Sequence, residues 1–283
     1  MLSLLAVILA ALLSVGLLRA REEQRALEAE HSKNAATAPP AGSEGFPDDG
    51  RTRGYLRLAE GSGRLFLFGD EAIYGRGLTD EHGAPIPLTY DCPTSFTSLT
   101  LAALRAEYGN KTEYDAGLPA NVIRDVVKTH TLTYAAEVVA RLVESGIPPS
   151  IILLSPSDAT RAAGHATAPE SYDFGRDLEA AVRSMRLFAP RADILLVIPT
   201  NANADTAATI RAVGEHYGLI TADLSTALGT DPALIHAEGA NAGFPTEVGH
   251  AAAALAIAEA VRLAVNEGHT APPLPADRLY PKS

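Results

Sequence analysis

The sequence predicts an α/β domain: three α/β/α layers, doubly wound around a mostly parallel, flavodoxin-like five-stranded sheet. Two observations support this prediction. The strand-like segments are continuous apolar runs rather than alternating ones, which is typical of parallel strands buried on both faces. Segments with helical spacing separate them, and right-handed crossovers place such helices on both faces of a sheet.

The elements follow one another in a regular alternation. The first apolar run ends at Gly69, and the fourth ends at Pro199, as glycine and proline commonly end such runs. Strands are expected at 65–68, 112–115, 151–154, 194–198 and 219–223, and helices at 97–108, 134–144, 177–188, 206–217 and 249–265.

Composition limits the function classes. The 283 residues are 47% hydrophobic and 20% charged, which suits one domain with an appendage. A net charge of -11 argues against nucleic acid or anionic lipid as the main partner. The single Cys92 excludes an internal disulfide and a multi-cysteine metal site. Neither a paired-histidine zinc motif nor a glycine-rich phosphate loop occurs, so no metal and no cofactor are expected.

The chain divides into four expected segments. Residues 1–18 carry no charged side chain and are long enough to span a bilayer. We expect 1–31 to be an uncleaved membrane anchor with a charged extension, 32–54 a flexible linker, 55–270 the folded domain and 271–283 a proline-rich tail. The alternative is a cleaved signal peptide and a secreted protein. Arginines at 19, 21 and 25 would favour a cytoplasmic domain by the positive-inside tendency.

Asp70 and Glu71 follow the first strand directly. Residues at the carboxyl ends of parallel strands line the crevice where open α/β folds bind ligands. The run ending in Gly69-Asp70-Glu71 resembles the first block of the SGNH/GDSL hydrolases, Gly-Asp-Ser, and the resemblance extends over about residues 64–264. It implies that Glu71 stands at the nucleophilic serine.

The second and third family blocks are also recognisable. Residues 115–119 resemble the block that supplies an oxyanion-hole glycine, here Gly117. After the strand at 151–154, Ser155 stands for the block glycine and Ser157 for the oxyanion-hole asparagine, while Asp158 is kept.

The last block lies before the final helix. Pro245, Gly249 and His250 match the family's ending, and this register places Asn241 at the triad aspartate and Phe244 at the triad histidine. The resemblance thus implies an intact scaffold in which the serine, asparagine, aspartate and histidine are all replaced. Family habit also implies a periplasmic or otherwise extracytoplasmic domain, against the arginine tendency.

These replacements remove the chemistry of acyl transfer. A carboxylate at 71 would attack an ester only to give an anhydride, and it repels a developing oxyanion. Phe244 transfers no proton, Asn241 stabilises no imidazolium, and Ser157 is shorter than asparagine. Family-type hydrolysis is therefore not expected.

Other residues are candidates for rewired chemistry or binding. His236 and His250 are possible substitutes for the lost base, and His165 is expected in a loop after the third strand. The expected cleft residues are Asp70, Glu71, Gly117, Ser155, Ser157 and Asp158. The alternative for Asp70, Glu71 and Asp158 is a carboxylate cluster that binds a cation through oxygen ligands. Tyr74, Arg76 and Asp80 are expected at the rim, where surface ion pairing is favoured over ligand binding.

Three functions remain open at this point. The first is an inactive, membrane-anchored domain that serves as a binding or structural subunit of a membrane-associated assembly. The second is a divergent hydrolase of ester or carbohydrate-ester groups with rewired residues. The third is a protein that binds a small polar ligand in the old cleft, where Glu71 would favour a cationic or hydroxyl-rich molecule.

Overall fold

The computed structural model describes most of the chain after residue 64. The described ranges are 65–80, 84–85, 92–108, 122–126, 132–146, 148–149, 151–167, 172–190, 192–267 and 274–281. All of them belong to one compact unit, Gly50–Ser283. The expected anchor at 1–31 and the linker at 32–54 lie outside the described residues.

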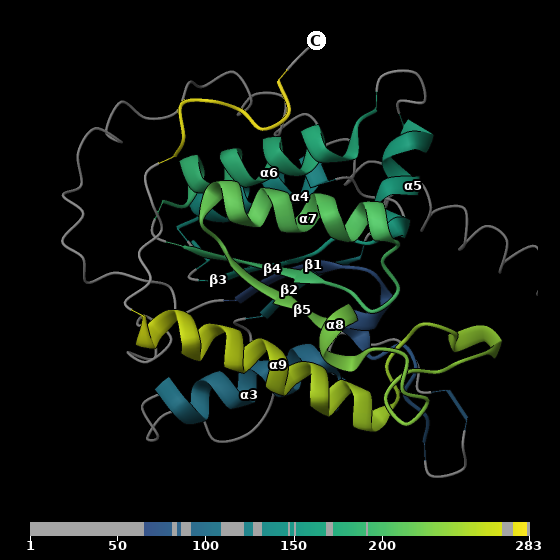
Figure 1. The fold of residues 1–283 in the computed structure, drawn as a ribbon. Helices are drawn as coiled ribbons and strands as arrows, with labels where there is room; N and C mark the ends of the chain where they lie inside the picture. Colours follow the sequence, from purple (N-terminus) through teal and green to yellow (C-terminus); the bar gives the residue numbers. More distant parts are fainter. Residues whose placement is uncertain are drawn as a thin grey trace, which may run out of the picture. The chain divides into compact units, whose positions relative to one another are not determined.

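Five parallel strands form one sheet, confirming the predicted α/β class (Figure 1). They are β1 (Leu65–Gly69), β2 (Val122–Val126), β3 (Ile151–Ser155), β4 (Asp193–Ile198) and β5 (Ile220–Asp223). Their order is β2-β1-β3-β4-β5, and every neighbouring pair is parallel. From β1 the chain first adds β2 on one side and then β3, β4 and β5 on the other. Folds of this type bind their ligands at such a switch point, here between β1 and β3.

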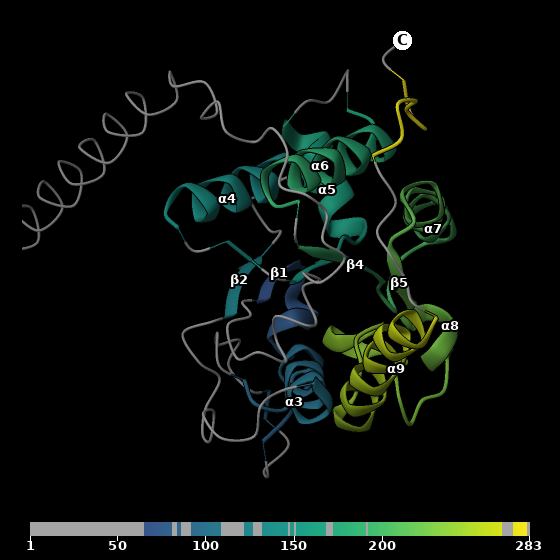
Figure 2. The ribbon, with the colours of Figure 1, turned by 90° about the vertical axis from the view of Figure 1, so that its left-hand side faces the viewer.

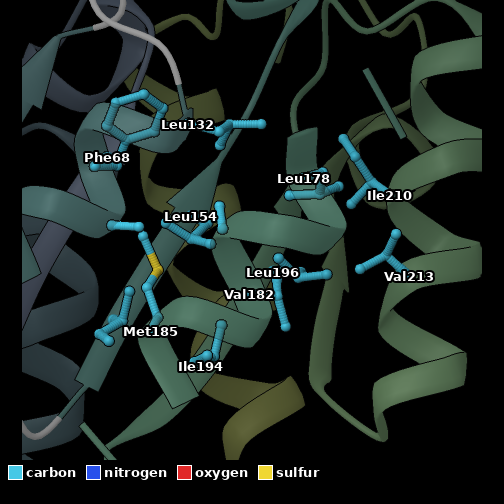
Figure 3. Packing of buried hydrophobic residues seen from close by; sticks show 14 of the residues in the cluster. Phe68, Leu132, Leu154, Leu178, Val182, Met185, Ile194, Leu196, Ile210 and Val213 are labelled. Atoms are coloured by element: carbon cyan, nitrogen blue, oxygen red, sulfur yellow. The ribbon is translucent and has the colours of Figure 1, made fainter. Parts of the chain in front are cut away.

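Helices cover both faces of the sheet (Figure 2). On one face lie α3 (Phe96–Tyr108), α8 (Leu224–Leu228) and α9 (Glu247–Asn266), and on the other α4 (Leu132–Glu144), α6 (Phe174–Phe188) and α7 (Ala204–Tyr217). Alternate residues of one strand enter opposite cores, so Leu153 packs on the α9 side and Leu154 on the α6 side. Figure 3 shows the second core, where Leu154, Leu178, Val182 and Leu196 interdigitate.

Two elements, β2 and α5 (Asp158–Thr167), were not expected from the sequence. The expected strand at 112–115 lies outside the described residues, and the strand hydrogen-bonded to β1 is β2, at Val122–Val126. His165 lies in α5 and not in a loop. Gly164 misled the prediction because glycine disfavours helices. Gly164 nevertheless lies within α5. A glycine is needed there because an added Cβ would collide with the Tyr172 ring.

α9 is long and apolar enough to cross a membrane by length and composition, and is the one such helix within the described ranges. Core helices of soluble proteins meet the same criterion, so it is weak evidence for a span. Its buried side, which includes His250, Ala253, Ile257 and Val261, joins the core on the sheet.

Candidate functional site

The end of β1 brings several of the expected cleft residues together. Gly69 is paired with Ser155 of β3, and a Cβ on Gly69 would lie 2.6 Å from the Ile73 side chain and 3.1 Å from Ser155 Cβ. Asp70 then caps the short helix η1 (Glu71–Tyr74) by accepting a 2.9 Å hydrogen bond from the Ala72 amide. The chain therefore turns sharply, and Glu71 begins η1 directly after the strand.

Asp70, directly after β1, is buried and bonded to several groups. Its second carboxylate oxygen accepts a 3.0 Å hydrogen bond from Asn201 Nδ2, and Ser157 also bonds to it. Burial raises the pKa of the Asp70 carboxyl, although the bonds from Asn201, Ala72 and Ser157 oppose that shift. Asn201 follows β4, and sequence reasoning missed it. The one sequence signal for Asn201 is its position shortly after the expected strand at 194–198.

Ser157 faces inward rather than into an open cleft. It is fully buried, its Oγ accepts from the Ala159 amide, and its own amide donates to Thr160 Oγ1 at 2.9 Å. Ser155 is also buried, at the end of β3. The Ser157 hydroxyl thus bonds both to Asp70 and within the turn that starts α5.

Asp158 holds a neighbouring loop. Its two oxygens accept from Thr206 Oγ1 at 2.6 Å and from the Asn203 amide at 3.1 Å, at the start of α7. The three carboxylates therefore bond to different groups of the protein. Among the described residues no group of three or more His, Cys, Asp or Glu is placed to hold a metal.

Arg76 joins all three positions at which the resemblance places the triad. Its NH1 donates to Glu71 Oε2 at 2.9 Å, and its Nε donates to Asn241 Oδ1 at 2.7 Å. Its NH2 donates to the Ala240 carbonyl at 2.8 Å, and its guanidinium carbon lies 5.6 Å from the centre of the Phe244 ring. We call Arg76 with Glu71, Asn241 and Phe244 the arginine network. Its guanidinium contacts the other three members of this network.

A hairpin-like segment presents Asn241 and Phe244 to this arginine. Residues 235 and 245 form an isolated antiparallel bridge, the short helix η2 (Gly239–Asn241) lies between them, and the His236 amide donates to the Phe244 carbonyl at 3.0 Å. His236 Nε2 donates to the Gly77 carbonyl at 2.8 Å. Gly77 is at φ 101°, and a Cβ there would strike the Pro245 carbonyl oxygen, so only glycine lets these two loops approach so closely.

His250 fixes the loop that carries Arg76 and faces away from solvent. Its Nδ1 accepts from the Phe96 amide at 3.1 Å, so the proton is on Nε2, which donates to the Arg76 carbonyl at 3.0 Å. The ring is fully buried and stacks on Phe96. Burial lowers the pKa of His250 to about 4, although the bond to Arg76 opposes that shift. The imidazole is therefore a neutral tie within the fold.

The remaining candidates are not brought into this group. Gly117 lies outside the described residues, and it precedes β2 rather than following it. His165 packs edge-on against Tyr172, with ring centres 5.0 Å apart, and Cys92 is buried beside Gly75. Sequence reasoning placed Arg76 only at the rim, since no family residue stands at that position.

The sheet order, the Asp70–Glu71 turn after β1 and the Gly249-His250 start of α9 agree with the resemblance to the SGNH hydrolases that the sequence shows. A Cβ on Gly249 would strike the Leu234 carbonyl oxygen, which explains the glycine before His250. No protein-family model matches the sequence, and no curated protein matches it.

Solved structures resemble the chain at the level of the fold. The C-terminal catalytic domain of peptidoglycan O-acetyltransferase A from Streptococcus pneumoniae is 16% identical, with a TM-score of 0.42 over 72% of this chain and 95% of that chain. A protein described as a GDSL-like lipase from Parabacteroides merdae is 14% identical, with a TM-score of 0.45 over 71% and 96%. A two-domain esterase active on acetylated mannans is 15% identical, with a TM-score of 0.49 over 80% of this chain and 58% of that chain.

Proposed function

We propose that this chain carries an SGNH-hydrolase-like domain without hydrolase activity, which serves as a binding or structural subunit of a membrane-associated assembly. The arginine network is the observation that carries the proposal. Arg76 bonds to the groups at the serine and aspartate positions and lies over the ring at the histidine position.

The chemistry of these contacts argues against acyl transfer. A serine nucleophile needs a base and oxyanion donors. Glu71 is paired with a guanidinium, and Phe244 has no titratable nitrogen. Asn241 Oδ1 already accepts from Arg76, and the Ser157 side chain is fully buried and bonded to Asp70 and to the Ala159 amide. Losing a single oxyanion donor costs roughly 10²-fold or more in rate, and here several groups are replaced together.

The alternative, a rewired ester or carbohydrate-ester hydrolase, needs a substitute base. His250 is buried, and both of its ring nitrogens are engaged. His236 Nε2 bonds to Gly77, which leaves its Nδ1 as the remaining candidate base. His236 is therefore the residue on which the alternative is tested.

The direct test is hydrolysis of p-nitrophenyl acetate by the purified full chain in detergent. We expect the rate to equal the buffer background, and to be the same for the His236→Ala and Glu71→Gln variants. Turnover well above background that either variant abolishes would overturn the proposal.

A complementary test restores the family residues. The variant combines Glu71→Ser, Ser157→Asn, Asn241→Asp and Phe244→His, with and without Arg76→Gln. Arg76 would otherwise neutralise the carboxylate introduced at position 241, so we expect hydrolysis to appear chiefly in the five-fold variant. The matched control is the five-fold variant with alanine in place of serine at position 71, which should be inactive.

Membrane association is proposed from the sequence alone. The apolar run at 1–18 would hold the domain at a membrane, with the domain outside the cytoplasm. Fractionation of cells expressing the full chain should place it in the membrane, and deletion of residues 2–18 should release it. A full chain that remains soluble would contradict this part. Proteins that co-purify with the membrane form would identify the assembly.

One observation favours a ligand-binding role for the same cleft. Asn201 Oδ1 is buried and, within the described residues, has no hydrogen-bond partner. Buried acceptors are usually satisfied, and a hydroxyl or ammonium group of a small polar ligand would satisfy this one. Thermal-shift screening of polyols and amines with wild-type chain and Asn201→Ala tests this. Stabilisation that survives Asn201→Ala would rule out this role for Asn201.

A further inference from the structure

A second glutamate, far along the chain from the arginine network, receives the C-terminal segment. Glu179 of α6 is fully buried. Its Oε1 accepts from Tyr217 Oη and from the Leu279 amide, both at 2.6 Å, and its Oε2 accepts from the Tyr280 amide at 2.9 Å. The carboxylate thus binds two successive main-chain N–H groups of residues that follow α9.

Further contacts hold the segment along the same helix, and we call the strip of α6 on which it lies, at Gly175, Glu179 and Arg183, the α6 groove. Arg183 NH1 donates to the Pro275 carbonyl at 2.8 Å, and to Tyr217 Oη at 3.1 Å. Tyr280 lies against Gly175, where a Cβ would be 2.7 Å from the ring. Leu274, Leu279 and Tyr280 pack against the core on this face of the sheet. Figure 1 shows the segment near the C-terminus crossing above α6.

These contacts have the form of peptide recognition. A carboxylate that accepts from backbone amides and an arginine that donates to a backbone carbonyl read the main chain and not the side chains. Side-chain selectivity comes from two places: the glycine that leaves room for an aromatic ring, and the apolar surface that receives leucine. Such a groove fits an extended peptide with an aliphatic residue followed by an aromatic one.

We propose that the α6 groove formed by Gly175, Glu179 and Arg183 is a peptide-recognition site that the chain's own residues 274–281 close. The C-terminal segment of a second copy has the same sequence and therefore fits the same groove in exchange. Exchange of an identical segment between copies is a common route to dimers. The proposal does not depend on whether the arginine network is catalytic.

Within a single chain, the covalently attached segment 274–281 outcompetes a free peptide for the α6 groove. Its effective concentration at the groove is of the order of millimolar, so a free peptide competes poorly until the tether's own contacts are weakened. Leu279→Ala with Tyr280→Ala removes two of the three side chains by which the segment packs against the core, and it leaves Gly175, Glu179 and Arg183 unchanged.

The test uses the full chain and a fluorescent peptide of residues 272–283. By fluorescence anisotropy, we expect saturable binding to the Leu279→Ala/Tyr280→Ala variant and at least roughly 10-fold weaker binding to wild type. Adding Glu179→Gln to the variant should weaken binding by about 10-fold or more, because charged hydrogen-bond acceptors contribute most. The matched control is the full chain with Asp277→Asn, at an exposed position of the segment. It should bind the peptide as weakly as wild type does.

Several results would overturn the proposal. One is a folded double variant, judged by circular dichroism, that binds no peptide. Another is a peptide carrying both alanines that binds as tightly as the native one. A third is hydrogen exchange showing residues 274–281 equally protected in wild type and double variant, since the two side chains would then not hold the segment.

Discussion

Glu71 and Glu179 are two glutamates that the fold treats differently. Glu71 follows β1, its side chain is 13% exposed, and Arg76 binds it through a guanidinium. Glu179 lies within α6, is fully buried, and is bound by one hydroxyl and two backbone amides. Burial raises the pKa of the Glu179 carboxyl, but these hydrogen bonds outweigh that effect and hold the pKa below its usual value.

The difference concerns what each carboxylate stabilises. Glu71 belongs to a partly exposed network of side chains at the end of β1. Glu179 joins α6, α7 and the C-terminal segment, which are distant in the sequence. The more conspicuous glutamate in the sequence is therefore expected to contribute less to stability than the inconspicuous one.

The largest expected effect is the loss of the buried carboxylate. Glu179→Ala should lower the free energy of unfolding by about 4 kcal/mol, because three donors lose a buried charged acceptor. Urea denaturation measures it. Glu259→Gln, which removes an exposed pairing with Arg262, is the matched control and should change stability by less than about 0.5 kcal/mol. Equal losses for Glu179→Ala and Glu259→Gln would show that the buried contacts of Glu179 stabilise the fold no more than an exposed ion pair does.

The pH dependence of the free energy of unfolding tests the role of His250, which bonds to the Arg76 carbonyl. The ordinary pKa of histidine is 6.5, and that of buried His250 is about 4. The unfolded chain therefore takes up this proton first, so stability is complete above pH 6.5 and falls by about 3 kcal/mol as the pH decreases to about 4. Urea denaturation from pH 7.5 to 4 should show a shallower decrease for His250→Gln. His165→Gln, at an exposed histidine, should leave the slope unchanged.

Removing the central guanidinium should have a smaller effect. Arg76→Ala should lower the free energy of unfolding by about 1.5 kcal/mol, since the network is partly exposed and its acceptors regain water. The loss should decrease at high salt. Arg76→Lys should lose most of the same energy, because an ammonium lacks the planar fork that reaches Glu71, Asn241 and Ala240 together. Full retention by lysine would show that charge alone matters.

The smallest effect is expected at Glu71 itself. Glu71→Gln keeps an oxygen that can accept from Arg76, so the free energy of unfolding should change by about 0.5 kcal/mol. Thermal and urea denaturation at low salt are the measurements. A loss as large as that of Glu179→Ala would show that the sequence was right to single out Glu71 as exceptional.

Much of the fold was predictable because its signals are local. Four of the five expected strands lie within one or two residues of β1, β3, β4 and β5, since continuous apolar runs ended by Gly or Pro identify buried parallel strands. β2 was missed because Val122–Val126 contains Arg124 and Asp125, which interrupt the apolar run. α5 was missed because its start coincides with the Ser157–Asp158 turn and it contains Gly164.

The candidate site was predictable only in part. Asp70, Glu71, Ser157 and Asp158 follow the strands β1 and β3, whose neighbouring positions bring these residues to one edge. Asn201 and the bonding role of Arg76 were not predictable, because each depends on contacts across 131 and 165 residues of sequence. No local pattern encodes such a pairing.

The sequence by itself determined the α/β class, the strand edge at Asp70–Glu71 and a resemblance to the SGNH hydrolase blocks that places Glu71, Asn241 and Phe244 at the triad positions. These follow from periodicity, strand ends and residue chemistry, which are properties of short segments. Only the tertiary structure decided that one guanidinium unites the degenerate positions, and that Glu179 receives the C-terminal segment. Those arrangements arise because folding buries charged groups, and each buried charge must find partners wherever the chain brings them.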